Sequence, residues 1–225
     1  MKNILLTLII GIILYSCSAS KIENNKTKYF DKNNKTRYFD ENNLEISESK
    51  YNQIRSTNKL LYIVGDSINH KKLTLREKRG KINDRSGLEL LLEKTTKIEL
   101  DSTKPIVIIY YPGKDENNSG AFKNYKSNSY NRKLIKQWYE QLEWGLNQVA
   151  KIKPLYIYKD SEGLKKYNGI LKWNKDPEKT IERLFFKYHY PGSSFVVISK
   201  NGDYISYFGE FGKKYVWEAT QIMNK

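Results

Sequence analysis

The chain of 225 residues has a single cysteine, Cys17, and only two histidines, His70 and His189. One cysteine cannot form a disulfide within the chain, and it cannot supply the paired thiols of a redox centre or a Cys-based zinc site. Neither histidine belongs to an HxxxH or HExxH spacing, so the common zinc-hydrolase motifs are absent. The sequence therefore predicts a protein without a metal site, a cofactor or thiol chemistry.

Long hydrophobic runs are also lacking, apart from residues 4–14, which follow Lys2 near the N-terminus. This run is too short for a membrane-spanning helix, which takes roughly 20 apolar residues, and its positive start and small residue before Cys17 are typical of a secretory signal. The stretch LYSC at 14–17 resembles the lipobox of bacterial lipoproteins. The resemblance implies a signal peptide at 1–16 and acylation (palmitate) at Cys17, with a plain cleaved signal before an incidental cysteine as the alternative.

Acidic residues are few relative to basic ones: 40 Lys and Arg face 25 Asp and Glu, for a net charge of +15. The lysines are spread over the chain instead of forming an Arg-rich stripe, and an exported protein does not meet cytoplasmic nucleic acid, so we expect no nucleic-acid partner. A Lys/Asn bias of the genome explains the charge. The alternative is attraction to anionic lipid headgroups or acidic glycans, which would weaken as salt rises.

A nine-residue repeat follows the expected signal. Its units are NNKTKYFDK at 24–32, NNKTRYFDE at 33–41 and NNLEISESK at 42–50. The pattern joins a Thr-x-Tyr-Phe strand candidate to an Asp-x-Asn-Asn turn, and Asn and Asp tolerate the backbone angles of turns. We expect a small β-meander within a tether at 17–58, with local duplication in a polar segment as the alternative, because three units are too few for a solenoid.

The next segment, 59–104, is expected to be a small α+β region. Its predicted parts are a strand at 60–64, an alternating stretch at 72–82, a helix at 87–94 capped by Ser86, and a short strand at 97–100. Residues 101–104 mark the expected boundary.

The last segment, 105–225, has the clearest pattern. The run PIVIIYY at 105–111 is continuously apolar and β-branched, as expected for a buried central strand. The predicted elements after it are a helix at 131–151, a strand at 154–158, a helix beginning at Asp176-Pro177, a hairpin of strands at 195–199 and 203–208, and a helix at 213–224. The order β-α-β-α-β-β-α predicts an α/β class for this segment, and α+β for the whole chain.

That order, together with PGSSFVVISKNGDYISYFGEF at 191–211, resembles the thioredoxin-like fold. The resemblance implies a thioredoxin-like domain at 105–225, with Pro191 as the structural proline, usually cis, that precedes the third core strand. The chain departs from the family after the first core strand, where YYPGKDENNSG at 110–120 replaces the redox cysteines. Because no sulfur is present there, thiol–disulfide exchange and peroxide reduction are excluded, and no catalytic residue of the family carries over.

A second resemblance concerns the stretches YFDEN at 38–42 and FKYHYP at 186–191. They are similar to stretches in lipoproteins of Bacteroidetes-type bacteria. This resemblance implies an outer-membrane lipoprotein and assigns no activity to it.

The loop after the first core strand lies where open α/β sheets bind ligands. Asp115, Glu116 and Asn117 are therefore candidate ligand-loop residues, and His189 joins them because it precedes the proline turn. The two carboxylates suit acid–base work or, with Asn117, a cation, and His189 suits proton donation. The plainer interpretation is a solvated loop and a histidine that bonds a backbone carbonyl.

Together these observations predict a lipid-anchored envelope protein of a Gram-negative outer membrane, without catalysis, that binds another envelope protein or an anionic glycan. Two alternatives remain open: a non-thiol enzyme centred on Asp115, Glu116 and His189, and an immunity-type protein that neutralises a toxin at the envelope.

Overall fold

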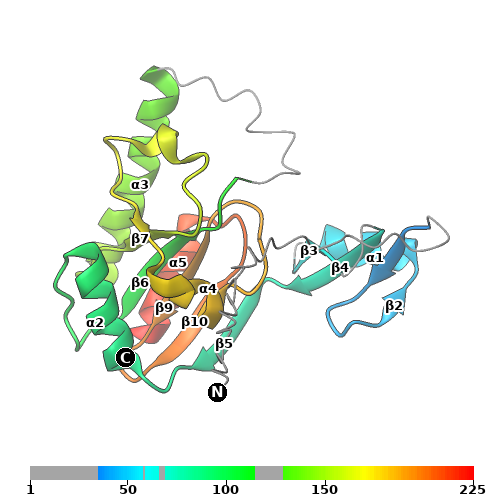
Figure 1. The fold of residues 1–225 in the computed structure, drawn as a ribbon, viewed down its shortest axis with the longest axis horizontal. Coiled ribbons are helices and arrows are strands. Elements are labelled where there is room, and N and C mark those ends of the chain that lie inside the picture. The colour runs from blue at the N-terminus through cyan, green and yellow to red at the C-terminus, as the bar shows by residue number, and fades with distance from the viewer. Residues whose placement is uncertain (1–34, 58, 66–68, 115–128) are drawn as a thin grey trace, which may run out of the picture.

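The structure is a computed structural model that describes residues 35–57, 59–65, 69–114 and 129–225. These residues form two lobes, each built on its own β-sheet (Figure 1). Cys17, Asp115, Glu116 and Asn117 lie outside the described residues. Within the described ranges, no helix is both long enough and apolar enough to cross a membrane.

The small lobe is a four-stranded sheet with one helix on it. Its elements are β1 (Arg37–Phe39), β2 (Glu45–Ile46), α1 (Glu48–Ser56), β3 (Leu60–Val64) and β4 (His70–Leu75). The sheet order is β2-β1-β4-β3, in which β1 runs parallel to β4 and the other pairs are antiparallel. Tyr51 of α1 packs on Leu60 and Leu73 to form the core of this lobe.

The repeat contributes a strand pair to this lobe. Its second and third units supply β1 and β2, and Asp40 Oδ1 closes the turn between them by accepting hydrogen bonds from the amides of Asn42 (2.9 Å) and Leu44 (2.8 Å). The expected meander is wrong beyond this pair of strands. The other neighbour of β1 in the sheet is β4, which runs parallel to it and lies outside the repeat. The unit 24–32 lies outside the described residues.

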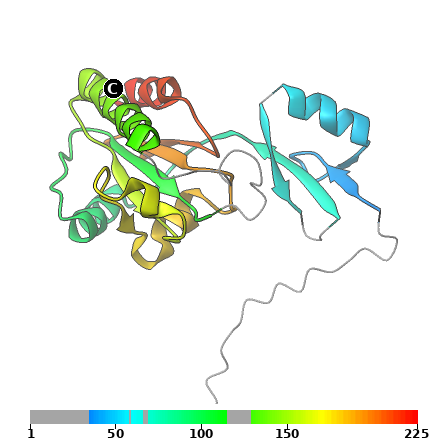
Figure 2. The same ribbon diagram turned by 90° about the horizontal axis from the view of Figure 1, so that it is seen from above.

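The large lobe is a six-stranded sheet with helices on both faces (Figure 2). Its elements are β5 (Glu77–Lys81), α2 (Arg85–Thr96), β6 (Ile106–Tyr111), α3 (Ser129–Ala150), β7 (Leu155–Tyr158), η1 (Leu164–Tyr167), β8 (Asn174–Lys175), η2 (Pro177–Lys179), α4 (Thr180–Phe185), β9 (Ser194–Ile198), β10 (Asp203–Tyr207) and α5 (Lys213–Met223). The strand order is β5-β10-β9-β6-β7-β8. Strands β6, β7 and β8 are parallel, and β9 and β10 run antiparallel to their neighbours.

The position of β6 in the centre of the sheet explains why its sequence is continuously apolar and does not alternate with polar residues. Ile108 packs in the core that contains residues of α2 and α4, whereas Ile109 packs in the core that contains residues of α3 and α5. All six residues of β6 are buried, because the strand lies between two others and is covered on both faces. The mixed α+β class is confirmed, whereas the order from β6 to α5 is β-α-β-β-α-β-β-α, because the two-residue strand β8 comes between β7 and α4 and was not predicted.

The expected unit 59–104 is divided between the lobes, and this corrects the predicted boundary. Strands β3 and β4 belong to the small sheet, but β5 pairs with β10 and α2 packs in the core of the large lobe. Two details also change: Asp84 caps α2 in place of Ser86, and Lys97 ends it with a left-handed backbone (φ 59°), so residues 97–100 form no strand. The choice of β10 as a partner is non-local and leaves no local pattern in the sequence.

The cis proline expected at Pro191 is also corrected. The described residues contain no cis peptide bond, so the bond between Tyr190 and Pro191 is trans. Gly192 provides the change of direction into β9 instead, because its φ of 70° lies in the region that glycine adopts without strain.

Besides the covalent connection from β4 to β5, the two lobes contact each other through side chains of β3. Successive residues of a strand face opposite ways, so Leu60 packs in the small lobe, whereas Ile63, three residues on, is 4% exposed within the core of the large lobe. Arg76 connects β4 to β5, and its Nη2 donates a hydrogen bond to the carbonyl oxygen of Glu210 (2.8 Å).

Candidate functional site

The sheet edge at the carboxyl end of β6 carries part of the site expected from the sequence. Tyr110 at the end of β6 pairs with Ser194 at the start of β9, so half-buried Pro191 lies at this edge. His189 is exposed in the segment between α4 and β9. Its proposed partners Asp115, Glu116 and Asn117 lie outside the described residues, so a combined site remains a prediction.

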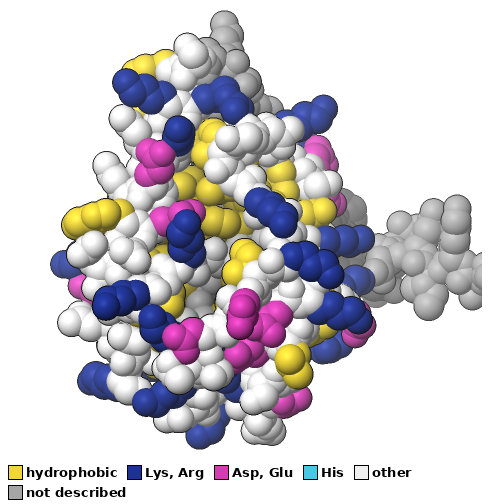
Figure 3. Space-filling view, turned by 90° about the vertical axis from the view of Figure 1, so that its left-hand side faces the viewer, with side chains coloured by type: hydrophobic (Ala, Val, Ile, Leu, Met, Phe, Trp, Pro, Cys, Tyr) yellow, Lys and Arg dark blue, Asp and Glu magenta, His cyan; other side chains and the backbone are white. Residues whose placement is uncertain are grey.

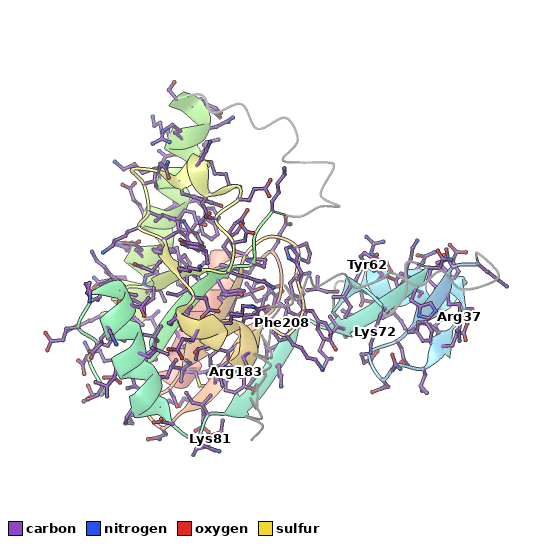
Figure 4. The ribbon with its side chains drawn as sticks, in the orientation of Figure 1. Arg37, Tyr62, Lys72, Lys81, Arg183 and Phe208 are labelled. Atoms are coloured by element: carbon purple, nitrogen blue, oxygen red, sulfur yellow. The ribbon has the colours of Figure 1, made fainter. Side chains whose placement is uncertain are left out.

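A hollow of about 290 Å³ lies between the two lobes, beside this segment. We call it the inter-lobe groove. Its described lining residues are Glu41, Thr74 and Leu75 of the small lobe, Lys78 of β5, Arg183, Leu184 and Phe185 of α4, Lys187, Tyr188 and Tyr190 of the following segment, and Phe208. Figure 4 shows Phe208 where the large lobe meets the small lobe, with Arg183 below it on α4.

The floor of the groove is the edge of the large-lobe core. Tyr190 stacks on Phe208 with ring centroids 4.4 Å apart and planes 10° from parallel, and Phe185 meets Tyr204 edge-on at 5.0 Å. Burial raises the pKa of Tyr190 above its ordinary value, so this phenol stays neutral at physiological pH. The floor is therefore aromatic and uncharged.

Three apolar side chains of the groove remain open to solvent. The exposed fractions are 52% for Leu75, 39% for Leu184 and 37% for Tyr188. A single exposed leucine on a protein surface is ordinary, but apolar side chains from both lobes that meet in one hollow are typical of an interaction site.

The cations of the groove are Lys78, Arg183 and Lys187, and none of them forms an ion pair with a described residue. Lys187 Nζ lies 5.5 Å from the ring centroid of Tyr188. Glu41 is the one carboxylate among the described lining residues. Among the described residues, three cations and one carboxylate therefore surround an apolar floor, and Arg183 also interacts electrostatically with the buried carboxylate of Asp176.

The face of the large lobe turned away from the small lobe has a different charge pattern. Figure 3 shows Lys and Arg side chains there interspersed with Asp and Glu around hydrophobic side chains. Neutralised pairs occur elsewhere on the lobe, such as Lys159 with Glu182 at 2.5 Å. What distinguishes the groove is that its cations lie beside exposed apolar side chains in one hollow.

No protein family, curated protein or solved structure matches this chain. Its function is accordingly argued from the chemistry of its own residues.

A second hollow, of about 230 Å³, lies on the face of the small sheet that α1 leaves uncovered. The polar groups along it bind one another. Arg37 holds Glu45 through two hydrogen bonds (2.7 and 3.1 Å), and Lys72 Nζ donates to Asn43 Oδ1 (2.9 Å). These contacts stabilise the β1–β2 turn region, so we regard this hollow as structural.

The groove offers positive charge beside apolar surface, which suits the binding of an anion. The described part of the chain contains no group of three His, Cys, Asp or Glu side chains that could hold a metal ion. The groove was not apparent from the sequence, because its cations come from separate segments within an evenly basic chain. The stretch FKYHYP at 186–191 contributes Lys187, Tyr188 and Tyr190 to the lining of the groove.

Proposed function

We propose that this protein is a lipid-anchored binding protein of the cell envelope, without redox activity, that holds an anionic ligand in the inter-lobe groove. One observation carries the proposal: Lys78, Arg183 and Lys187 have no ion-pair partner among the described residues and surround an apolar floor. Cations in such a cleft attract an anion, and the apolar floor supplies affinity that does not depend on salt.

The proposal includes a thioredoxin-like scaffold for the large lobe. The order β6-α3-β7-α4-β9-β10-α5, to which the short edge strand β8 is added after β7, supports it, as does the turn at Asn201-Gly202 between β9 and β10. The only cysteine of the chain is Cys17, far from β6 in sequence, so this scaffold has no thiol with which to perform exchange chemistry.

The membrane anchor rests on the sequence around Cys17. Replacing this residue in Cys17→Ala removes the acylation site, so we expect metabolic labelling with a palmitate analogue to mark the natural protein and not the variant. Immunoprecipitation followed by detection of the label measures this. Equal labelling of Cys17→Ala and the natural protein would contradict a lipid anchor at this residue.

The groove itself is tested by photo-cross-linking in intact cells. A photoreactive amino acid at Leu184 faces the groove, and the same amino acid at Leu90, which is 67% exposed on α2, is the positional control. We expect a discrete cross-linked species from position 184 and none from position 90.

The cations provide the second half of this test. The variant Arg183→Glu/Lys187→Glu should reduce the cross-link from position 184 by about tenfold, because each exposed charge contact contributes up to about 1 kcal/mol and reversal adds repulsion. The matched control is Lys153→Glu/Lys165→Glu, two exposed lysines outside the groove. Equal cross-linking in both double variants would refute the proposed function.

A further inference from the structure

The aromatic rings of the inter-lobe groove are engaged with one another. One face of Tyr190 stacks on Phe208, and Tyr188 meets Tyr190 edge-on with centroids 6.1 Å apart. The ammonium group of Lys187 lies over the ring of Tyr188. Nucleobases, and sugar rings through their apolar C–H faces, are recognised by lying on an open aromatic face. Of the described aromatic lining residues, Tyr188 is exposed (37%), and the Lys187 ammonium group lies over its ring, so the groove offers little such surface and suits a glycan less well.

The open apolar groups of the groove are better suited to an aliphatic side chain. Leu75 of the small lobe and Leu184 of the large lobe are both exposed within it. The volume of about 290 Å³ lies just below the range for small-molecule pockets, roughly 300–1,000 Å³. It is sufficient for one or two side chains of an extended segment that continues past the groove at both ends.

The charges of the groove are unevenly distributed between the lobes. Lys78 on β5, Arg183 in α4 and Lys187 after it all belong to the large lobe, whereas Glu41 belongs to the small lobe. A ligand that matches this pattern places its carboxylates on the side of the large lobe. Next to the small lobe it has a neutral or basic group, because carboxylates close to Glu41 would repel it.

We infer that the occupant of the inter-lobe groove is an extended acidic segment of a partner protein, with one aliphatic side chain on the floor between Leu75 and Leu184 and with Asp or Glu residues at Lys78, Arg183 and Lys187. This inference rests on the proposed function and narrows its ligand from any anion to a polypeptide. An acidic glycan is the competing occupant, and the experiment separates the two.

The test uses the lipidated full chain in detergent micelles and two probes. The first is a library of random short peptides, selected on the natural protein and counter-selected on Arg183→Glu/Lys187→Glu. The second is an oligogalacturonate, which has carboxylates but no aliphatic side chain. Fluorescence anisotropy of labelled probes measures affinity, and circular dichroism confirms that each variant is folded.

We expect the selected peptides to carry Asp or Glu beside a Leu, Ile, Val or Met. Arg183→Glu/Lys187→Glu should weaken their binding about tenfold, and the control Lys153→Glu/Lys165→Glu should leave it unchanged. Replacing the aliphatic residue of the peptide with Ala should also cost about tenfold, because buried apolar area is lost. Glu41→Gln should strengthen the binding of peptides that are acidic along their whole length.

Several outcomes overturn the inference. Selected peptides without acidic residues, or peptides that bind Arg183→Glu/Lys187→Glu equally well, would show that charge does not select the ligand. Binding of the oligogalacturonate that depends on the groove cations, with no such peptide, would identify a glycan as the occupant while the proposed function stands. Failure of both probes together with no cross-link from position 184 in cells would remove the proposed function as well.

Discussion

At the scale of single residues, Asp176 shows how a carboxylate in this protein is used for structure. It is 6% exposed, and its two oxygens accept hydrogen bonds from the amides of Ile181 (2.9 Å) and Glu182 (2.8 Å). These amides belong to the first turn of α4, whose own backbone cannot satisfy them. Asp176 therefore caps α4 across the intervening turn η2.

The buried position of Asp176 leads to a pH-dependent prediction. Burial raises the pKa of this carboxyl, and this effect exceeds the opposing effect of its two backbone hydrogen bonds. A carboxyl whose pKa is higher in the folded state binds its proton more tightly there than in the unfolded chain. Stability is therefore gained as pH falls through the raised folded-state pKa towards the unfolded value, and is lost as pH rises.

Asp176→Asn removes this titration while keeping a side chain that can cap the helix. We expect Asp176→Asn to be more stable relative to the natural protein at pH 7 than at pH 4, that is, to have a larger relative free energy of unfolding at pH 7. Urea unfolding at the two pH values measures the difference. A difference that is constant, or that changes in the opposite direction, would show that burial does not control this carboxyl.

At the scale of elements, the contact between α3 and α5 depends on a glycine. A Cβ atom built on Gly145 of α3 would lie 2.2 Å from Cε2 of Trp217 on α5. The indole Nε1 of Trp217 donates to the Leu142 carbonyl oxygen (3.1 Å), which holds the ring against α3. The close approach of the two helices thus requires a residue without a side chain at position 145.

Gly145→Ala sets helix propensity against packing. Alanine favours an isolated helix by about 1 kcal/mol, but overpacking at a fixed contact costs about 1–3 kcal/mol. Because the Trp217 ring is fixed by its hydrogen bond, we expect Gly145→Ala to destabilise the protein, as measured by its urea midpoint. In a Trp217→Ala background the same substitution should become neutral or stabilising. A gain in stability from Gly145→Ala alone would contradict this account of the contact.

At the scale of the whole molecule, β3 makes the two lobes interdependent. Ile63 belongs to the small sheet by its backbone and to the large core by its side chain. All four tryptophans lie in the large lobe, so their fluorescence reports the unfolding of that lobe alone. This arrangement allows the contribution of β3 to be measured.

Ile63→Ala should lower the stability of the large lobe even though the substitution is made in the small sheet. A buried Ile replaced by Ala costs about 2–5 kcal/mol, so the midpoint of tryptophan fluorescence in urea should fall clearly. Leu73→Ala, which removes a side chain from the core of the small lobe, is the comparison and should lower that midpoint less. Equal midpoints for Ile63→Ala and the natural protein would place Ile63 outside the large core.

What the sequence determined by itself is local. The apolar run of β6, the Asp40 turn, the helix at α3 and the hairpin of β9 and β10 were predictable because hydrophobic period and turn residues act between near neighbours. The chemistry excluded by a single cysteine was equally visible, because no fold can supply a missing atom.

Only the tertiary structure decided how these elements are shared. It paired β5 with β10 and not with the preceding hairpin of β3 and β4, and it placed the Ile63 side chain in the core of the large lobe. It also put the turn before β9 at Gly192, without a cis proline. It also brought Lys78, Arg183 and Lys187 to one groove. Such groupings depend on which distant surfaces bury each other, and this property belongs to the folded chain as a whole because no short stretch of sequence carries it.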